Sequence, residues 1–379
     1  MAEQGADASF VCAVLEGGGA SCVPGGGPIR VACLHGGPGS SLIGLWQNSA
    51  RQFVYLSYKP GHHATGAHRG ISLSCDMSPL ICGRRSTVQI DPFFDEDSST
   101  FSYILLDEKS GQCAIIDSVL GYDPRSGRLS RDGAQRIAAR VRERNASVQW
   151  ILETHVHADH LSAAPYLQSQ LGGCTGIGSH IRTVQQVFGD LFNAEPEFSR
   201  DGRQFDHLFH DGETFTLGTL QVRAMHTPGH TPACMTYLVR DTAAPDAPAV
   251  AFVGDTLFMP DHGTARCDFP GGDARTLFRS IGRVLSLPPD TVLYMCHDYR
   301  PGGRALQWKT TVAEERAHNI HVHDGISEDD FAATRAQRDA SLAMPVLLLP
   351  AVQINMRAGE LPPAESNGVR YLKIPIDAF

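Results

Sequence analysis

Residues 154–160 constrain this chain more than any other stretch of its sequence. They hold three histidines and one aspartate in the pattern H-x-H-x-D-H. Residues 148–153 before them are rich in strand formers, and residues 161–168 after them can open a helix. Imidazole and carboxylate groups crowded at one strand end are poorly tolerated unless a cation holds them, and a divalent metal is the usual one. The pattern predicts a metal-binding turn at a strand end, with a solvated polar loop as the alternative.

Composition narrows the class of protein and its partners. The chain has 379 residues, 42% of them hydrophobic, which is enough for one large or two ordinary domains. Its net charge of -9 disfavours nucleic acid or an anionic membrane as the main partner. No apolar run reaches transmembrane length, and the first residues lack the features of a secretory signal. Ten cysteines without a C-x-x-C spacing fit free thiols in a reducing compartment. We therefore expect a cytoplasmic protein without nucleic-acid or membrane partners.

The character of the sequence changes twice along the chain. Residues 1–76 contain three glycine-rich runs and few charges, so we expect a mobile N-terminal extension. From Met77 the composition becomes that of an ordinary globular domain, and residues 86–302 are predicted to form the catalytic domain. Residues 303–379 are predicted to be a C-terminal extension packed on that domain.

Short strands and helices alternate through the predicted catalytic domain. Residues 132–144 and 180–192 have helical spacing, residues 172–178 read as a loop of small residues, and residues 215–225 read as one strand. Ligand-type side chains follow three further strands, at His230, Asp255 and His297. Such a pattern predicts an α/β layered fold with a polar site along one sheet edge.

The ordered set of the H-x-H-x-D-H motif, His230, Asp255 and His297 resembles the metallo-β-lactamase superfamily. This resemblance implies an αββα sandwich with a metal site at the edge between its sheets. By position, His155, His157 and His230 correspond to the ligands of one metal. Asp159, His160 and His297 correspond to the ligands of a second metal, with Asp255 between the two.

Smaller motifs resemble one branch of that superfamily. Residues 227–231 (TPGHT), 254–258 (GDTLF), 265–269 (ARCDF) and 297–299 (HDY) are similar to glyoxalase II-like enzymes, and above all to the persulfide dioxygenases. Bacterial β-lactamase-like hydrolases share the pattern. In the dioxygenases, residues matching His155, His230 and Asp255 hold a single iron. The resemblance also implies that Arg266 and Tyr299 lie near glutathione, although the spacing from Asp255 to Arg266 is two residues longer than in the animal enzymes.

Two reactions and one non-catalytic role follow from this resemblance. One Fe²⁺ per chain implies a dioxygenase that converts glutathione persulfide, or a related thiol substrate, and molecular oxygen to sulfite and glutathione, with Asp159, His160 and Tyr299 as catalytic residues. Two Zn²⁺ imply a glyoxalase II-like thioester hydrolase, a hydroxyacylglutathione hydrolase, in which a bridging hydroxide attacks the carbonyl. The third option is a metal-binding sensor without catalysis. All seven donors are present, so the set of donors does not distinguish one iron from two zinc ions. The sequence also leaves open whether the protein forms a homo-oligomer.

Overall fold

The computed structural model describes residues 30–35, 41–46 and 86–378, and the chain divides into two units, Met1–Leu80 and Ile81–Phe379. In the first unit, β1 (Arg30–His35) and β2 (Ser41–Trp46) pair as an antiparallel two-stranded sheet. Apart from these two strands, residues 1–76, for which we predicted a mobile extension, lie outside the described residues. The second unit contains all the other described strands and helices.

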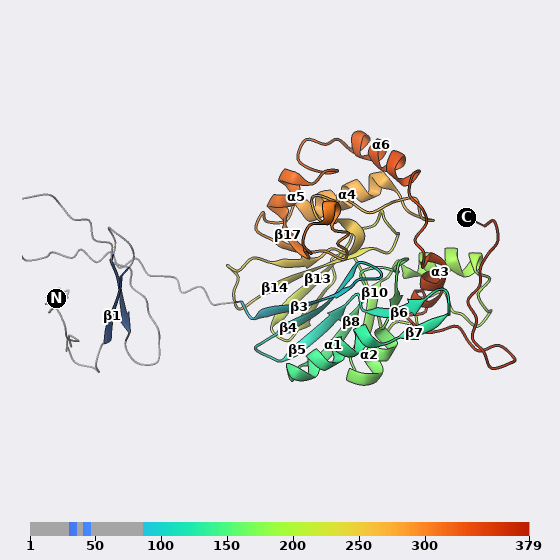
Figure 1. Cartoon of the computed structure of the whole chain (residues 1–379), viewed down its shortest axis with the longest axis horizontal. Helices are drawn as coiled ribbons and strands as arrows, with labels where there is room; N and C mark the ends of the chain where they lie inside the picture. The colour runs from blue at the N-terminus through green and yellow to red at the C-terminus, as the bar shows by residue number, and fades with distance from the viewer. Residues whose placement is uncertain (1–29, 36–40, 47–85, 379) are drawn as a thin grey trace, which may run out of the picture. The chain divides into compact units, whose positions relative to one another are not determined.

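Two six-stranded sheets form the centre of this unit (Figure 1). The first sheet has the order β11-β10-β8-β5-β4-β3, and the second has the order β12-β13-β14-β15-β16-β17. The first comprises β3 (Val88–Asp95), β4 (Thr100–Asp107), β5 (Gln112–Ile116), β8 (Ser147–Leu152), β10 (Cys174–Gly178) and β11 (His207–Phe209). The second comprises β12 (Thr214–Leu217), β13 (Leu220–His226), β14 (Met235–Asp241), β15 (Val250–Phe252), β16 (Val292–Tyr294) and β17 (Lys309–Thr311). A small three-stranded sheet, β7-β6-β9, adds β6 (Val119–Asp123), β7 (Arg128–Ser130) and β9 (Leu161–Ser162).

Strand β4 shows why the two sheets stack. It carries apolar side chains on both faces, and all eight of its residues are buried, as expected for a strand covered on both sides. Tyr103 and Leu105 point into a core shared with Tyr237 and Phe252 of the second sheet. Ile104 and its outward neighbours belong instead to the core beneath the helices. The alternation of side chains along one strand thus feeds two hydrophobic layers.

Helices cover the outer face of each sheet (Figure 1). On the first sheet, α1 (Asp132–Glu143) and α2 (Ala164–Leu171) pack against the strands. On the second sheet, α4 (Ala274–Leu285) does the same, with α6 (Glu328–Asp339) beside it. Helix α4 begins where the Asp273 carboxylate accepts a hydrogen bond from Thr276 N at 2.7 Å, which is an N-cap. The helices α3 (Ile181–Leu191), α5 (Val312–His318) and α7 (Leu348–Asn355) complete the unit.

The resulting order of layers is helix, sheet, sheet, helix, and the predicted αββα sandwich is confirmed. Two local expectations were wrong. The loop expected at residues 172–178 is the parallel strand β10, whose glycines allow close packing: a Cβ on Gly176 would lie 2.7 Å from the Phe209 ring. The single strand expected at residues 215–225 is a hairpin of β12 and β13, which turns at Gly218 with a φ of 60°.

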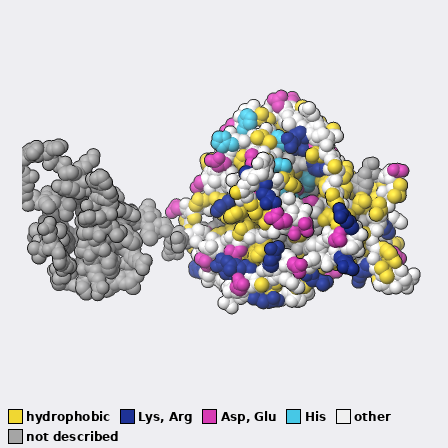
Figure 2. All heavy atoms as spheres, viewed as in Figure 1, with side chains coloured by type: hydrophobic (Ala, Val, Ile, Leu, Met, Phe, Trp, Pro, Cys, Tyr) yellow, Lys and Arg dark blue, Asp and Glu magenta, His cyan; other side chains and the backbone are white. Residues whose placement is uncertain are grey.

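Residues after 302 belong to the same compact unit as the sheets. They provide the edge strand β17 and the helix α7, which packs beside β9 and α3. On the face that Figure 2 shows, basic and acidic side chains are interspersed. Among the described residues, no helix combines the length and apolar character needed to cross a bilayer.

Candidate metal centre

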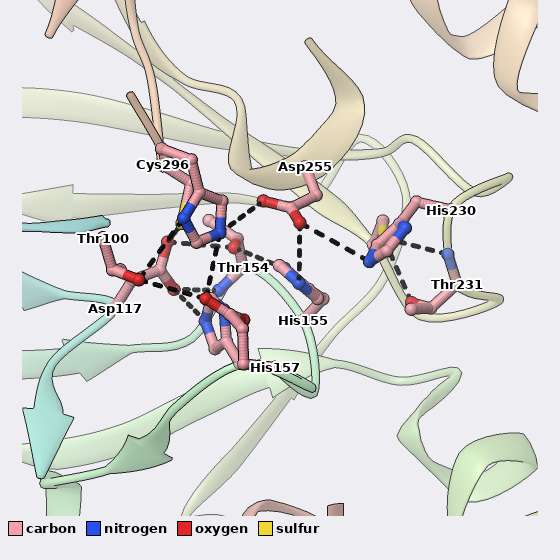
Figure 3. A network of polar contacts seen from close by, with 12 residues as sticks. Thr100, Asp117, Thr154, His155, His157, His230, Thr231, Asp255 and Cys296 are labelled. Atoms are coloured by element: carbon pink, nitrogen blue, oxygen red, sulfur yellow. Dashed lines mark hydrogen bonds and ion pairs between the residues drawn. The ribbon is translucent and has the colours of Figure 1, made fainter. Parts of the chain in front are cut away.

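The predicted donors meet at one edge of the sandwich, where several strands end (Figure 3). The loop after β8 carries His155, His157, Asp159 and His160. The other three donors come from the second sheet: His230 from the loop after β13, Asp255 from the turn η1 (Gly254–Thr256) after β15, and His297 after β16. The two halves touch here, because Thr100 and His297 form a β-bridge and Phe101 N donates to Cys296 O at 2.7 Å. The site therefore lies on the seam between the sheets.

Three donors from three different loops face one point. Asp255 Oδ2 lies 3.8 Å from His155 Nε2 and 3.5 Å from His230 Nε2. Figure 3 shows the Asp255 carboxylate between these two imidazoles. Two ligands on one ion, with bonds of about 2.1 Å at 90–110°, lie about 3.0–3.4 Å apart. The observed separations are close to that range, so this triad can hold an ion after small side-chain adjustments.

Several buried donor atoms here have no hydrogen-bond partner among the described residues. They are His155 Nε2, His157 Nδ1, His160 Nε2, Asp255 Oδ1 and His297 Nε2. A buried polar atom without a partner costs about 1–3 kcal/mol, so a cluster of them calls for an explanation. A metal ion would take up the free atoms of the donors that surround it, and the residues present therefore fit metal binding.

Contacts on the far side of each imidazole ring fix its orientation. His155 Nδ1 lies 3.0 Å from Thr154 Oγ1, and His157 Nε2 lies 3.0 Å from Asp117 Oδ1. His230 Nδ1 donates to Arg266 O at 2.7 Å. Each ring thereby presents its other nitrogen to the cluster, the arrangement usual for metal-binding histidines.

The remaining donors mark a second position next to the triad. His157, Asp159 and His160 each offer an atom within 4.8 Å of the others. His297 Nε2 lies 3.2 Å from Asp255 Oδ1 and 3.4 Å from Asp159 Oδ2. Asp255 thus faces the triad with one oxygen and the second position with the other. The structure brings all seven predicted donors together, and their roles as ligands stay predictions.

Burial and neighbouring charges set the protonation of these groups. Burial, together with the charge of His157, lowers the pKa of His155 well below its ordinary value, which keeps this imidazole neutral. Burial opposes charge on His297 as well, but Asp255 and Asp159 outweigh it and raise its pKa to about 9. For Asp255, burial favours the neutral acid, yet the surrounding histidines lower its pKa. The cluster is thus a balanced set of imidazoles and carboxylates.

Glycines precede two of the donors where no side chain fits. Gly229, before His230, has a φ of 138°, and a Cβ there would lie 2.4 Å from Leu277 N. Gly254, before Asp255, has a φ of 52°, and its Cβ would lie 2.6 Å from Thr154 Oγ1. Both turns need the conformational freedom and small size of glycine to aim the next residue.

A cavity of about 1040 Å³ opens beside the donors, lined by His160, His230 and Asp255 at its inner end. Both residues predicted to bind substrate lie in its wall. Tyr299 is 45% exposed, and its ring stacks on His297 with centroids 5.5 Å apart. The Arg266 guanidinium is already bound to the Asp268 carboxylate at 2.6 and 2.7 Å and to Ala343 O at 2.7 Å.

Sequence reasoning missed four residues that support or line the site. Asp117 and Glu153 flank His157, and Asn355 donates to His157 O at 2.9 Å and His160 O at 2.8 Å. His262 packs against Tyr299 with ring centroids 4.6 Å apart. Asp117 ends a buried strand, as the recognised donors do, and this signal could have identified it. Asn355 lies 198 residues from His157, and no local pattern marks it.

The chain is similar to several known proteins over about three quarters of its length. The chain is 64% identical over 292 residues to a probable metallo-hydrolase of Burkholderia pseudomallei, covering 76% of this chain and 99% of that protein. It is 48% identical over 290 residues to glyoxylase B2 of Dictyostelium discoideum, covering 76% and 97%. It is 30% identical over 284 residues to the mitochondrial persulfide dioxygenase ETHE1 of Bos taurus, covering 74% and 93%.

Among solved structures, ETHE1 from Myxococcus xanthus is similar, with a TM-score of 0.56 and 27% identity over 72% of this chain and all of that one. Residues 96–297 match the family model described as the metallo-β-lactamase superfamily. This match covers every donor of the cluster and all strands of the two large sheets except the edge strands β3 and β17. The chain belongs to the metallo-β-lactamase superfamily, as its sequence motifs predicted.

Proposed function

We propose that this protein is an iron-dependent persulfide dioxygenase that oxidises glutathione persulfide to sulfite and glutathione. The observation that carries the proposal is the triad of His155, His230 and Asp255, in which one carboxylate oxygen faces both imidazoles. Two histidines and one carboxylate on one face are the donor set of mononuclear non-haem iron oxygenases. The similarity to persulfide dioxygenases, at 30% identity over most of their length, supports the same reaction.

The balanced reaction consumes one persulfide, one oxygen and one water. The terminal sulfur loses four electrons to oxygen, the S–S bond breaks, and glutathione, sulfite and two protons are released. A bound iron would supply the redox chemistry and the open positions for both reactants. The chain's own groups hold those reactants in register.

Residues near the triad orient its imidazoles and position the water. Thr154, Asp117 and the Arg266 carbonyl orient the imidazoles of His155, His157 and His230. Asp159 is partly exposed to the cavity and accepts from Thr100 Oγ1 at 3.1 Å, so it can position the water that supplies the third sulfite oxygen.

His160 lies beside Asp159, with its Nδ1 3.6 Å from Asp159 Oδ2, and holds that carboxylate in place. Tyr299 forms the cavity wall over His297, where it limits the access of bulk water and contacts the substrate.

A thioester hydrolase is the second candidate, and a specific observation favours it. Unpartnered atoms of His160 and His297 mark a second position that a two-metal site needs. The similarity to glyoxylase B2, at 48% identity, favours the same reading. A metal-binding sensor without catalysis is the least supported option, because all seven donors are present and face one another.

One experiment separates these candidates. The purified full chain is analysed for metal after expression without added zinc. The iron-loaded protein is then given glutathione persulfide in an oxygen electrode and, separately, lactoylglutathione. The proposal expects about one iron per chain and persulfide-dependent oxygen uptake with sulfite release. Two tightly bound zinc ions, with thioester cleavage and no oxygen uptake, would overturn it in favour of the hydrolase.

A further inference from the structure

The cavity beside the donors is far larger than a reacting sulfur atom requires. At about 1040 Å³ it can take up a whole thiol carrier of drug-like size. Donors of the cluster line one part of it, and other parts are lined by Arg335 and Arg338 of α6 and by residues 342, 343 and 345–347 of the connection to α7. Side chains on this wall can therefore contact the part of the carrier that lies away from the sulfur.

Four arginines line this cavity; two of them are held in ion pairs, and a third lies opposite a carboxylate on the paired strand. Arg266 pairs with Asp268. Arg335 is bound to Asp339 and donates to Thr264 O at 3.0 Å. Arg128 lies opposite Asp123 in the β6–β7 pair, and its charge helps to lower the pKa of that carboxyl.

The fourth, Arg338, differs from them. It is exposed and lines the cavity, and none of the described residues forms an ion pair or hydrogen bond with its guanidinium. Among the four described arginines of the cavity, Arg338 has neither an ion pair nor a carboxylate opposite it on a paired strand. Such a group is free to bind an anionic ligand.

The position of Arg338 is well defined because its helix is anchored. Arg335 and Asp339 of α6 are buried, and Asp339 Oδ2 accepts a hydrogen bond from Cys267 N at 2.9 Å. Cys267 lies in the loop that follows η1. One residue before Asp339, Arg338 emerges into the cavity. This part of α6 is therefore fixed to the same loop that carries Arg266.

A row of rings leads along the cavity away from the metal donors. His262 and Arg338 both line this cavity, and the charge of Arg338 is, after burial, a cause that lowers the pKa of His262. The His262 ring lies 4.6 Å from Tyr299, and Tyr299 lies 5.5 Å from His297. An extended ligand can lie along these rings, with its sulfur at the donors and its far end at Arg338.

We infer that Arg338 binds a carboxylate at the far end of the thiol carrier, so that the site selects thiols bearing carboxylates over neutral ones. The inference rests on the proposed function in one respect, namely that the reacting sulfur lies at the donor cluster. Arginine suits this role because its guanidinium binds a carboxylate through two parallel hydrogen bonds. Arg266 then shapes the wall through its own ion pair, and Arg338 provides the recognition.

The test measures binding separately from turnover. The metal-loaded full chain is titrated with glutathione and with glutathione diethyl ester, which keeps the thiol but has neutral carboxyl groups. The variants are Arg338→Ala, Arg338→Lys and, as a matched control, Arg142→Ala, which removes an exposed arginine from α1. KM and kcat for whichever sulfur substrate is turned over are measured on the same preparations.

The wild type and Arg142→Ala should bind glutathione about tenfold more tightly than Arg338→Ala, the loss expected for one charge-assisted contact. Arg338→Lys should recover part of the loss. KM should rise with Kd while kcat stays within about twofold, and the diethyl ester should bind the wild type and Arg338→Ala equally. An unchanged Kd for glutathione in Arg338→Ala, or full preference for glutathione over its ester in that variant, would overturn the inference. If persulfide is not oxidised but a thioester is cleaved, the proposed function fails while the binding comparison still decides the role of Arg338.

Discussion

Asn355, at the end of α7, is predicted to hold the metal turn in its binding conformation. Its Nδ2 donates to His157 O at 2.9 Å and to His160 O at 2.8 Å, and its Oδ1 accepts from Ser162 N at 2.8 Å. Asn355 is 4% exposed, so all three bonds are shielded from water. At about 1 kcal/mol for each hydrogen bond, Asn355→Ala should lower the free energy of unfolding by about 3 kcal/mol.

The same helix offers a matched control in Gln353. This buried amide also makes three hydrogen bonds, to Leu349 O at 2.7 Å, to Lys373 O at 2.9 Å and from Lys373 N at 2.8 Å, but none to the metal turn. Gln353→Ala should therefore cost a similar stability without changing metal affinity. Asn355→Ala should lower both the stability and the metal affinity, because the backbone carbonyls of His157 and His160 lose the hydrogen bonds that hold them in place.

Two assays check this pair of variants. Urea unfolding of the metal-free proteins gives the change in stability, and competition with a chelator gives the metal affinity. The reasoning is refuted if Asn355→Ala binds metal as tightly as Gln353→Ala, or if its unfolding free energy lies within about 1 kcal/mol of the wild type, less than a single lost contact of this kind would allow.

Three further predictions concern the donors, a buried acid and the N-terminal region. His230→Ala should lose most of its bound metal in elemental analysis, whereas His318→Ala, which changes an exposed histidine, should keep it. Burial raises the pKa of Glu315 to about 8. The folded protein therefore holds this proton more tightly than the unfolded chain, so the contribution of Glu315 to stability is complete below pH 4.5 and is lost as the pH rises towards 8. Glu315→Gln should remove this pH dependence, so that its free energy of unfolding rises relative to that of the wild type by on the order of 4 kcal/mol between pH 5 and pH 8. Stability curves of the two proteins that run parallel with pH would contradict the prediction. A chain beginning at Met77 should fold, bind metal and keep most activity, since all donors lie in the unit Ile81–Phe379; circular dichroism and metal content check this, and an insoluble product would mean that the boundary is wrong.

The sequence predicted the layered fold and the donor cluster because both leave local patterns. Apolar runs such as residues 250–253 predict buried strands, and a polar residue directly after each run predicts a site at the sheet edge. Asp255 and His297 each follow such a run, and the structure brings Asp255 Oδ1 within 3.2 Å of His297 Nε2. The order of residues along the strands was enough for a layered fold with a polar site at one sheet edge, whereas the αββα arrangement and the donor assignments came from the resemblance to the superfamily.

The support of the site could not be predicted in the same way. Asn355 reaches the metal turn across almost two hundred residues, and its position depends on how α7 packs beside β9. Arg338 is one exposed arginine on a polar helix, and only the buried pair of Arg335 and Asp339 fixes where it emerges. Such roles follow from tertiary packing, which no single segment encodes. The strand β10 was missed for a related reason, because its glycines resemble a loop until Phe209 is seen against them.

The seam on which the donors lie has a consequence for the mechanics of the molecule. One sheet contributes the loop that carries His155 and His160, and the other contributes His230, Asp255 and His297. An ion bound among them is a cross-link between two halves of the chain that are also held by side-chain packing, hydrogen bonds and one β-bridge. Metal binding therefore stabilises the contact between the two sheets, and loss of the metal makes it easier for them to separate at this edge. The durability of the folded protein, and with it its lifetime against proteases, is thereby coupled to the supply of the metal.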